Sequence, residues 1–184
     1  MWIFGYGSLV WRPAFEFSTR RPAYVTGYMR RFWQASPDHR GTDEAPGRVV
    51  TLLAETNAQT WGMAYQIAPE NSDEILDQLD YREKAGYERH TVALHDTVER
   101  AVFADGLIYI ASPGNPNFVG ESSLEEVAAI ARVAHGPSGP NREYVLRLHE
   151  ALVEMGASDD HVGDLARLVA TGGNVGSSPS SDST

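Results

Sequence analysis

The stretch that most constrains the fold is residues 61–67, in which every second side chain is large and apolar. The large residues are Trp61, Met63, Tyr65 and Ile67, and the residues between them are Gly62, Ala64 and Gln66. A period of two places the large side chains on one face of a β-strand, so this stretch predicts a strand buried on one side. A second apolar run, residues 49–53, precedes it across the polar residues 55–57. The two runs are predicted to pair as an antiparallel hairpin.

Strand-like segments fill most of the first two thirds of the chain, and helix-like segments fill the last third. Further β-branched and aromatic runs lie at residues 23–29, 87–94 and 98–110, and Asp105-Gly106 is either a hairpin turn or a bulge within the last run. Three helices are predicted to be capped at their N-termini by Asn71, by Ser122 or Ser123, and by Asn141, and a last helix is predicted around residues 162–169. This order predicts an α+β fold, a small curved or closed antiparallel β-barrel flanked by helices. A parallel α/β sheet is the weaker alternative.

Composition narrows the classes of function. The 184 residues predict a single domain over 1–171, followed by a disordered polar tail over 172–184. A net charge of −10 disfavours nucleic acid and anionic membrane surfaces as partners. No apolar run could span a bilayer, and Trp2-Ile3-Phe4 does not follow a basic leader, so a cytoplasmic protein is expected. The absence of cysteine excludes disulfides and thiolate chemistry.

An apolar run near the N-terminus breaks into the turn Gly5-Tyr6-Gly7-Ser8. Glycine permits φ > 0 and close approach of a ligand, so successive N–H groups of such a turn can converge on a carboxylate or an oxyanion. A purely structural turn is the alternative. Dinucleotide and P-loop motifs are excluded, because Val10 stands where a third glycine would be required and no Gly-Lys-Ser/Thr follows.

Once metal sites and serine-hydrolase sites are set aside, a carboxylate is the remaining candidate for a catalytic group. The six histidines show no metal-ligand spacing, and Ser8 lacks the Gly-x-Ser-x-Gly elbow of serine hydrolases. Residues 80–87 crowd carboxylates, cations and aromatic side chains at the end of a predicted helix. They form either part of a site or a solvated helix end with a glycine cap.

Seven segments carry a family resemblance. They are Phe4-Gly5-Tyr6-Gly7-Ser8-Leu9, Arg31-Phe32-Trp33-Gln34, Asp38-His39-Arg40-Gly41, Pro46-Gly47-Arg48-Val49-Val50-Thr51-Leu52, Trp61-Gly62, Tyr81-Arg82-Glu83-Lys84-Ala85-Gly86-Tyr87 and Gly136-Pro137-Ser138-Gly139-Pro140-Asn141. Together they resemble the ChaC family, the glutathione-specific γ-glutamylcyclotransferases. The resemblance runs in order from residue 1 to about residue 170.

The resemblance implies a small barrel flanked by helices that cleaves glutathione into 5-oxoproline and cysteinylglycine without cofactor, metal or obligate protein partner. It implies that Glu83 is the catalytic carboxylate. It also implies a substrate-binding turn made of Ile3, Phe4, Gly5, Tyr6, Gly7 and Ser8. Arg40 or Arg48 is expected to balance a substrate carboxylate. Two alternatives stay open: a cyclotransferase for other γ-glutamyl amines or amino acids, and a non-catalytic module that binds glutathione.

Overall fold

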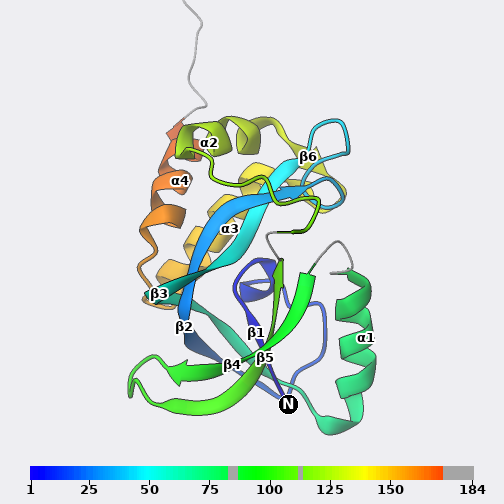
Figure 1. Ribbon diagram of the computed structural model, residues 1–184, viewed down its shortest axis with the longest axis vertical. Coiled ribbons are helices and arrows are strands. Elements are labelled where there is room, and N and C mark those ends of the chain that lie inside the picture. The colour runs from blue at the N-terminus through cyan, green and yellow to red at the C-terminus, as the bar shows by residue number, and fades with distance from the viewer. Residues whose placement is uncertain (83–86, 112–113, 172–184) are drawn as a thin grey trace, which may run out of the picture.

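A computed structural model of the chain describes residues 1–82, 87–111 and 114–171, and Figure 1 shows its elements. The strands are β1 (Trp2–Gly5), β2 (Thr19–Ser36), β3 (Gly47–Gln66), β4 (Tyr87–Asp96), β5 (Val102–Ala111), β6 (His135–Gly136) and β7 (Gly139–Pro140). The α-helices are α1 (Ser72–Arg82), α2 (Leu124–Val133), α3 (Asn141–Glu154) and α4 (Asp160–Thr171), and two 3₁₀ turns are η1 (Ser8–Val10) and η2 (Pro69–Asn71).

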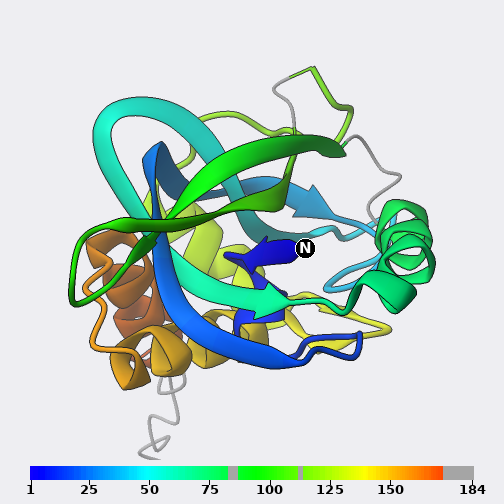
Figure 2. The same ribbon diagram turned by 90° about the horizontal axis from the view of Figure 1, so that it is seen from below.

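Five strands form a closed barrel in the order β1-β3-β2-β4-β5, which confirms the predicted α+β barrel. Four of its seams are antiparallel, and the seam that closes it, between β1 and β5, is parallel and pairs Ile3 with Leu107. Two of the seams are short, because β2 pairs with β4 only at Ala23 and Tyr24 and β1 pairs with β5 only at Ile3. Figure 2 looks into the barrel from below, with the N-terminus near its centre and α1 to one side.

The predicted hairpin between residues 49–53 and 61–67 is wrong. Both runs belong to the single strand β3, and both pair with β2, as in the partners Leu53 with Met29 and Trp61 with Tyr24. Because β2 is 18 residues long, it spans both runs. The excess residues of β3 between the runs are absorbed by a bulge, where Asn57 takes a φ of 76° opposite Gly27 at 82°.

The two strands predicted within residues 87–110 are present as β4 and β5, and they pair with each other as an antiparallel hairpin. Asp105 and Gly106 are neither a turn nor a bulge, since they pair in regular register with Ala93 and Val92. The chain reverses just before β5, where Arg100 adopts a φ of 61°. This reversal carries no glycine, so it lacks the Asp-Gly signal that made Asp105-Gly106 a candidate for a turn or a bulge.

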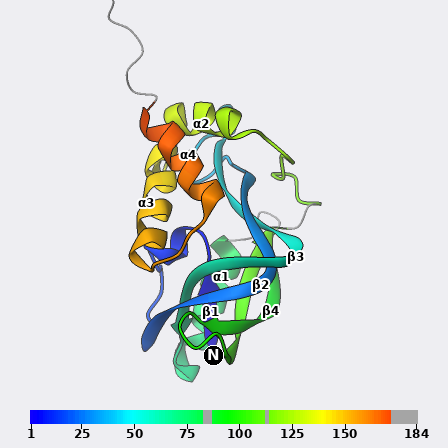
Figure 3. The same cartoon turned by 90° about the vertical axis from the view of Figure 1, so that its left-hand side faces the viewer.

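Helices α2, α3 and α4 gather on one side of the long strands β2 and β3, whereas α1 stands apart against β4 and β5 (Figures 1 and 3). The capping box at Ser123 and Glu126 is present, with each side chain bonded to the other residue's backbone N–H. Asn141 is not a cap. Its buried side chain instead accepts from the Arg48 N–H at 2.6 Å and donates to the Arg48 carbonyl at 2.7 Å, which ties α3 to β3.

The apolar interior has two parts. The larger core lies between the barrel and the three late helices, and the predicted inward residues of α3 and α4 belong to it: Tyr144, Leu148, Leu152, Val162, Leu165 and Val169. A smaller core contains Ile3, Met63, Tyr65, Ile67, Ile75, Leu79 and Tyr109, and it attaches α1 to the barrel. None of the helices in the described part of the chain is long and apolar enough to cross a membrane.

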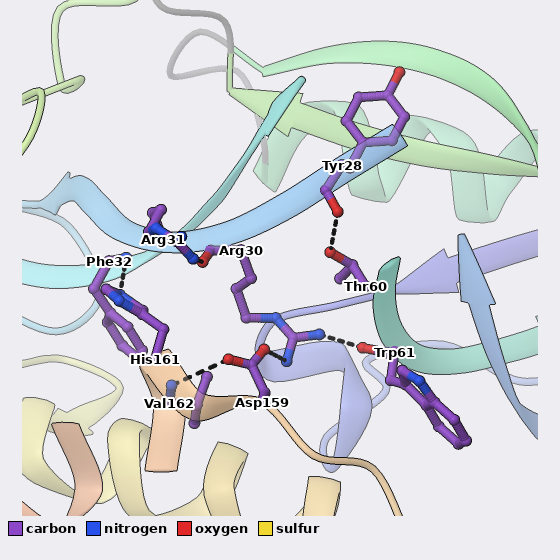
Figure 4. A network of polar contacts seen from close by, with 9 residues as sticks. All are labelled: Tyr28, Arg30, Arg31, Phe32, Thr60, Trp61, Asp159, His161 and Val162. Atoms are coloured by element: carbon purple, nitrogen blue, oxygen red, sulfur yellow. Dashed lines mark hydrogen bonds and ion pairs between the residues drawn. The ribbon is translucent and has the colours of Figure 1, made fainter. Parts of the chain in front are cut away.

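A buried charge joins α4 to the barrel (Figure 4). Arg30 on β2 is 2% exposed, and its guanidinium donates to Asp159 at 3.1 Å and to the Trp61 carbonyl. Asp159 also accepts from the Val162 N–H at 3.1 Å, so it caps the first turn of α4. One carboxylate therefore neutralises a buried cation and starts a helix.

A neutral histidine adds a second tie at the same place. The Phe32 N–H donates to His161 Nε2 at 3.2 Å. Burial, together with the nearby charges of Arg31 and Arg30, lowers the pKa of His161 to about 4. His161 is therefore uncharged at neutral pH and keeps the lone pair that accepts this bond.

Candidate functional site

A cavity of about 340 Å³ lies where the N-terminal turn, the far end of β2 and helix α3 meet. Its volume falls within the ~300–1,000 Å³ usual for small-molecule sites. One wall is the chain from Phe4 to Leu9, and the opposite wall is polar and runs from Gln34 to Arg40. Further lining residues are Arg12, Ala14, Val49, Val50, Tyr87, Tyr109, Asn117, Ser138 and Tyr144.

The predicted substrate-binding turn lies largely in this wall. Phe4, Gly5, Tyr6, Gly7 and Ser8 all line the cavity. Ile3 does not line it, because its side chain is fully buried in the smaller core. The turn is fixed from below by the Tyr65 hydroxyl, which donates to the Leu9 carbonyl.

The expected reason for glycine in this turn is wrong in one respect. Neither glycine has positive φ, and Gly7 has φ −114°. A Cβ on Gly5 would lie 2.6 Å from the Cβ of Leu9, and one on Gly7 would lie 2.8 Å from the Tyr144 hydroxyl and 3.2 Å from Val50. Close packing against protein side chains, and not backbone conformation, excludes a side chain here.

Gly7→Ala is accordingly expected to displace the Tyr144 hydroxyl, lower stability by about 1–3 kcal/mol and reshape the cavity wall. The matched test repeats the substitution in Tyr144→Phe, which lacks the colliding oxygen and whose ring carbon would lie 4.0 Å away. Thermal unfolding should then show a smaller loss from Gly7→Ala in the Tyr144→Phe background. Equal losses in both backgrounds would contradict the assigned contact.

The polar wall is held in place by α3 and the loop before it. Arg40 is buried, and its guanidinium donates to the Pro140 carbonyl at 3.1 Å and stacks over the Tyr144 ring at 5.6 Å. Glu143 lies 3.9 Å away. His39 Nδ1 lies 3.2 Å from the Ser138 hydroxyl. These contacts explain why the segments around residues 38–41 and 136–141, far apart in sequence, act as one surface.

Of the two arginines expected to meet a substrate carboxylate, only Arg40 lines the cavity. Arg48 holds α3 through its backbone, and its guanidinium donates to the Gly47 carbonyl at 3.1 Å. Arg12 also lines the cavity, and within the described residues its exposed side chain makes no hydrogen bond or ion pair. Sequence reasoning missed Arg12 and the cavity-lining role of Tyr144, because Tyr144 is indistinguishable in sequence from the core stripe of its helix.

The predicted catalytic carboxylate, Glu83, lies outside the described residues. The residues on either side of that gap are placed: α1 ends at Arg82, and Tyr87, the first residue of β4, lines the cavity. Tyr109 of β5 lines it as well, and its hydroxyl donates to Asp80 of α1 at 2.7 Å. Asp80 is exposed at the helix end, as one interpretation of residues 80–87 expected, but it is also paired with side chains of the barrel.

Metal ligands do not gather in this region. In the part of the chain that the structure describes, no group of three or more histidine, aspartate or glutamate side chains is arranged to hold an ion. The cavity instead offers backbone, hydroxyl, amide and guanidinium groups around an apolar floor. Such a surface suits a small zwitterionic substrate with more than one carboxylate.

Comparison with known proteins gives concordant results. The family model described as ChaC-like protein matches residues 1–172. The mouse protein named glutathione-specific gamma-glutamylcyclotransferase 1 is 43% identical over 177 residues, covering 93% of this chain and 78% of the mouse protein. Gamma-glutamylcyclotransferase 2-3 of Arabidopsis thaliana is 42% identical over 92% of this chain and 88% of its own length.

A solved structure agrees with these relatives. The yeast γ-glutamyl cyclotransferase specific to glutathione superposes with a TM-score of 0.86 at 31% identity, covering 92% of this chain and 95% of the yeast chain. A structure named gamma-glutamyl cyclotransferase, at 16% identity and a TM-score of 0.55, shares the fold.

Proposed function

The chain belongs to the ChaC family, and from this premise we infer that it is a γ-glutamylcyclotransferase that acts on glutathione. The observation that carries the inference is the match along residues 1–172, together with relatives at 42–44% identity that bear this name. The cavity supports it, since its walls are formed by segments of the same motifs: residues 4–9, 34, 38–40, 49–50 and 138. The enzyme is a lyase that breaks an amide bond by closing a ring.

We propose that the substrate supplies its own nucleophile. The α-amine of the γ-glutamyl group attacks the γ-carbonyl carbon, and a five-membered ring forms. The C–N bond to the cysteinyl nitrogen then breaks, which gives 5-oxoproline and cysteinylglycine. The attacking ammonium nitrogen loses two protons and the leaving nitrogen gains two, so the reaction needs neither water nor an external reductant. Holding the substrate folded contributes much of the rate, because the attack is intramolecular.

In this proposal Glu83 is the base that takes one proton from the ammonium group, which frees the amine to attack, and returns that proton to the leaving nitrogen. The attacking nitrogen loses its second proton as the lactam forms, and the released cysteinylglycine amine takes that proton up. It lies in the chain between α1 and Tyr87, which lines the cavity. The turn from Phe4 to Ser8 cradles the γ-glutamyl group. Ile3, the remaining residue of the implied turn, would act through its backbone, because its side chain belongs to the core.

Two arginines can form ion pairs with the two carboxylates of glutathione. Arg40 is buried and already held by α3, so it suits the part of the substrate that is withdrawn from water. Arg12 is exposed at the cavity and suits the glycine carboxylate at the other end of the tripeptide. We also place the enzyme in the cytoplasm, where glutathione serves as the reducing thiol.

The direct test is incubation of the purified protein with reduced glutathione, followed by mass spectrometry. We expect equimolar 5-oxoproline and cysteinylglycine. A parallel panel of γ-glutamylcysteine, γ-glutamylalanine and γ-glutamyl-ε-lysine should react poorly. If a member of this panel reacts faster than glutathione, that compound and not glutathione is the substrate. If glutathione binds but no product forms, the protein is the non-catalytic module.

A further inference from the structure

The last turn of α1 is fastened to the barrel by a compact polar cluster, made of Asp80, Arg89 and Tyr109 and called here the α1 latch. Arg89 Nε donates to Asp80 Oδ1 at 2.6 Å, and Arg89 Nη2 pairs with Asp80 Oδ2, so the ion pair is bidentate. The Tyr109 hydroxyl donates to Asp80 Oδ1 at 2.7 Å and accepts from Arg89 Nε at 3.1 Å. Each member therefore contacts the other two.

Three different elements contribute to the latch. Arg89 on β4 and Tyr109 on β5 are direct partners in the strand register, so they present one prepared surface. Asp80 approaches that surface from α1. The hydrogen bond from Arg89 is the main cause that lowers the pKa of Asp80, and the carboxylate is therefore charged at neutral pH.

The buried side chains of α1 form a narrow stripe. Among the described side chains of α1, Ile75 and Leu79 are buried, and the residues after Leu79 whose side chains are placed, Asp80 and Tyr81, are exposed. Ile75 and Leu79 pack in the smaller core and attach the helix to the barrel. The bidentate carboxylate–guanidinium pair adds a directional restraint at the end of the helix.

The latch also reaches the candidate site. Tyr109 lines the cavity, as does Tyr87. Burial and the hydrogen bond to Asp80 raise the pKa of Tyr109. The Tyr109 hydroxyl therefore stays protonated at neutral pH and donates a hydrogen bond to Asp80. Asp80 thus orients a side chain of the cavity wall while it also fixes the helix that leads into residue 83.

We propose that Asp80 is a positioning residue for the cyclotransferase reaction: through Arg89 and Tyr109 it sets the place of the α1 end from which the chain carrying Glu83 departs. The proposal rests on the proposed function and on the role assigned to Glu83. Asp80 touches neither the substrate nor the reacting atoms. It acts through geometry, and a base displaced by about an ångström loses rate while the substrate still binds.

Steady-state kinetics with glutathione test the proposal. Asp80→Ala should lower kcat by about 10–100-fold, with KM changed by less than about twofold. Because the latch is more than a third exposed, the melting temperature should fall by no more than about 4 °C. Asp80→Asn, which keeps an acceptor for Tyr109 and loses the charge, should fall between the wild type and Asp80→Ala.

The matched control is Asp77→Ala, on the same helix one turn earlier. Asp77 is exposed, and within the described residues its side chain makes no recorded contact. Its kcat should stay within about twofold of wild type. A cycle with Arg89→Met should be non-additive, since either substitution opens the same latch.

Three outcomes overturn different statements. If Asp80→Ala turns over as fast as Asp77→Ala while the wild type consumes glutathione, Asp80 is not a positioning residue and the proposed function stands. If the wild type itself releases no 5-oxoproline from glutathione, the proposed function fails, and this inference fails with it. A loss in Asp80→Ala that Asp80→Asn does not lessen, accompanied by an equal rise in KM, would assign the latch a purely structural role.

Discussion

Glu83→Gln is expected to lower kcat for glutathione by about 10²–10⁴-fold while glutathione still binds. Glutamine keeps the shape and much of the hydrogen bonding of glutamate but cannot accept the proton of the ammonium group. Glu83→Asp should also be slow, because one methylene withdraws the carboxylate by about an ångström from a geometry that tolerates little error. Product release is measured at steady state, and binding is measured by calorimetry with Glu83→Gln.

The control for this prediction is Glu88→Gln. Glu88 is 62% exposed, and its ion pair among the described residues is a loose contact of 3.8 Å with His90, so its loss should change kcat by less than about twofold. Asp80 cannot serve as that control, because it belongs to the α1 latch. Near-normal turnover of Glu83→Gln would refute the carboxylate assignment, and Glu74 on α1 would be the next acid to substitute.

Asp159→Ala is expected to destabilise the fold by about 3 kcal/mol or more. The substitution removes the carboxylate that neutralises the buried Arg30, and breaking a buried pair from one side typically costs about 3–5 kcal/mol. It also removes the cap at the Val162 N–H, worth about 1 kcal/mol. For a chain of this length the melting temperature should fall by roughly 6–12 °C, measured by calorimetry.

Asp164→Ala is the matched control on the same helix. Asp164 pairs with Arg167 at the surface, and such pairs contribute about 0–1 kcal/mol. Adding Arg30→Met to Asp159→Ala should restore part of the lost stability, because the unpaired buried charge is removed. Two results would contradict this explanation: a melting temperature of Asp159→Ala within about 2 °C of wild type, or a further loss of stability when Arg30→Met is added. In either case the destabilisation would not come from an unpaired buried guanidinium.

Local patterns predicted the element types well and the pairing less well. The alternation from Trp61 to Ile67 correctly indicated a half-buried strand, and the Ser123 to Glu126 spacing correctly placed a helix start. The partner of that strand was wrong, because a polar stretch such as residues 55–57 is equally compatible with a hairpin turn and with a bulge. Only the presence of the 18-residue β2 alongside decides between them.

For the site, too, local features could be predicted from the sequence and contacts between distant residues could not. Short motifs located the turn that lines the cavity, since glycines packed this tightly leave a local signature. The motifs could not say that Gly7 makes room for Tyr144, because the two residues are far apart in sequence. For the same reason Asn141 was predicted as a cap: its real partner, the Arg48 backbone, lies on a different element.

The parallel seam between β1 and β5 has a consequence for how the chain acquires activity during synthesis. Ile3 and Leu107 meet only after about a hundred residues have followed β1 out of the ribosome, and closing so long a loop makes the seam a late, slow contact. The turn from Gly5 to Ser8 begins at the last residue of β1. A nascent chain truncated before β5 can hold that turn only through β3, by the pairing of β1 with β3 and by the Tyr65 hydroxyl. The cavity is therefore completed only when β5 and then α3 add Tyr109 and Tyr144 to its lining.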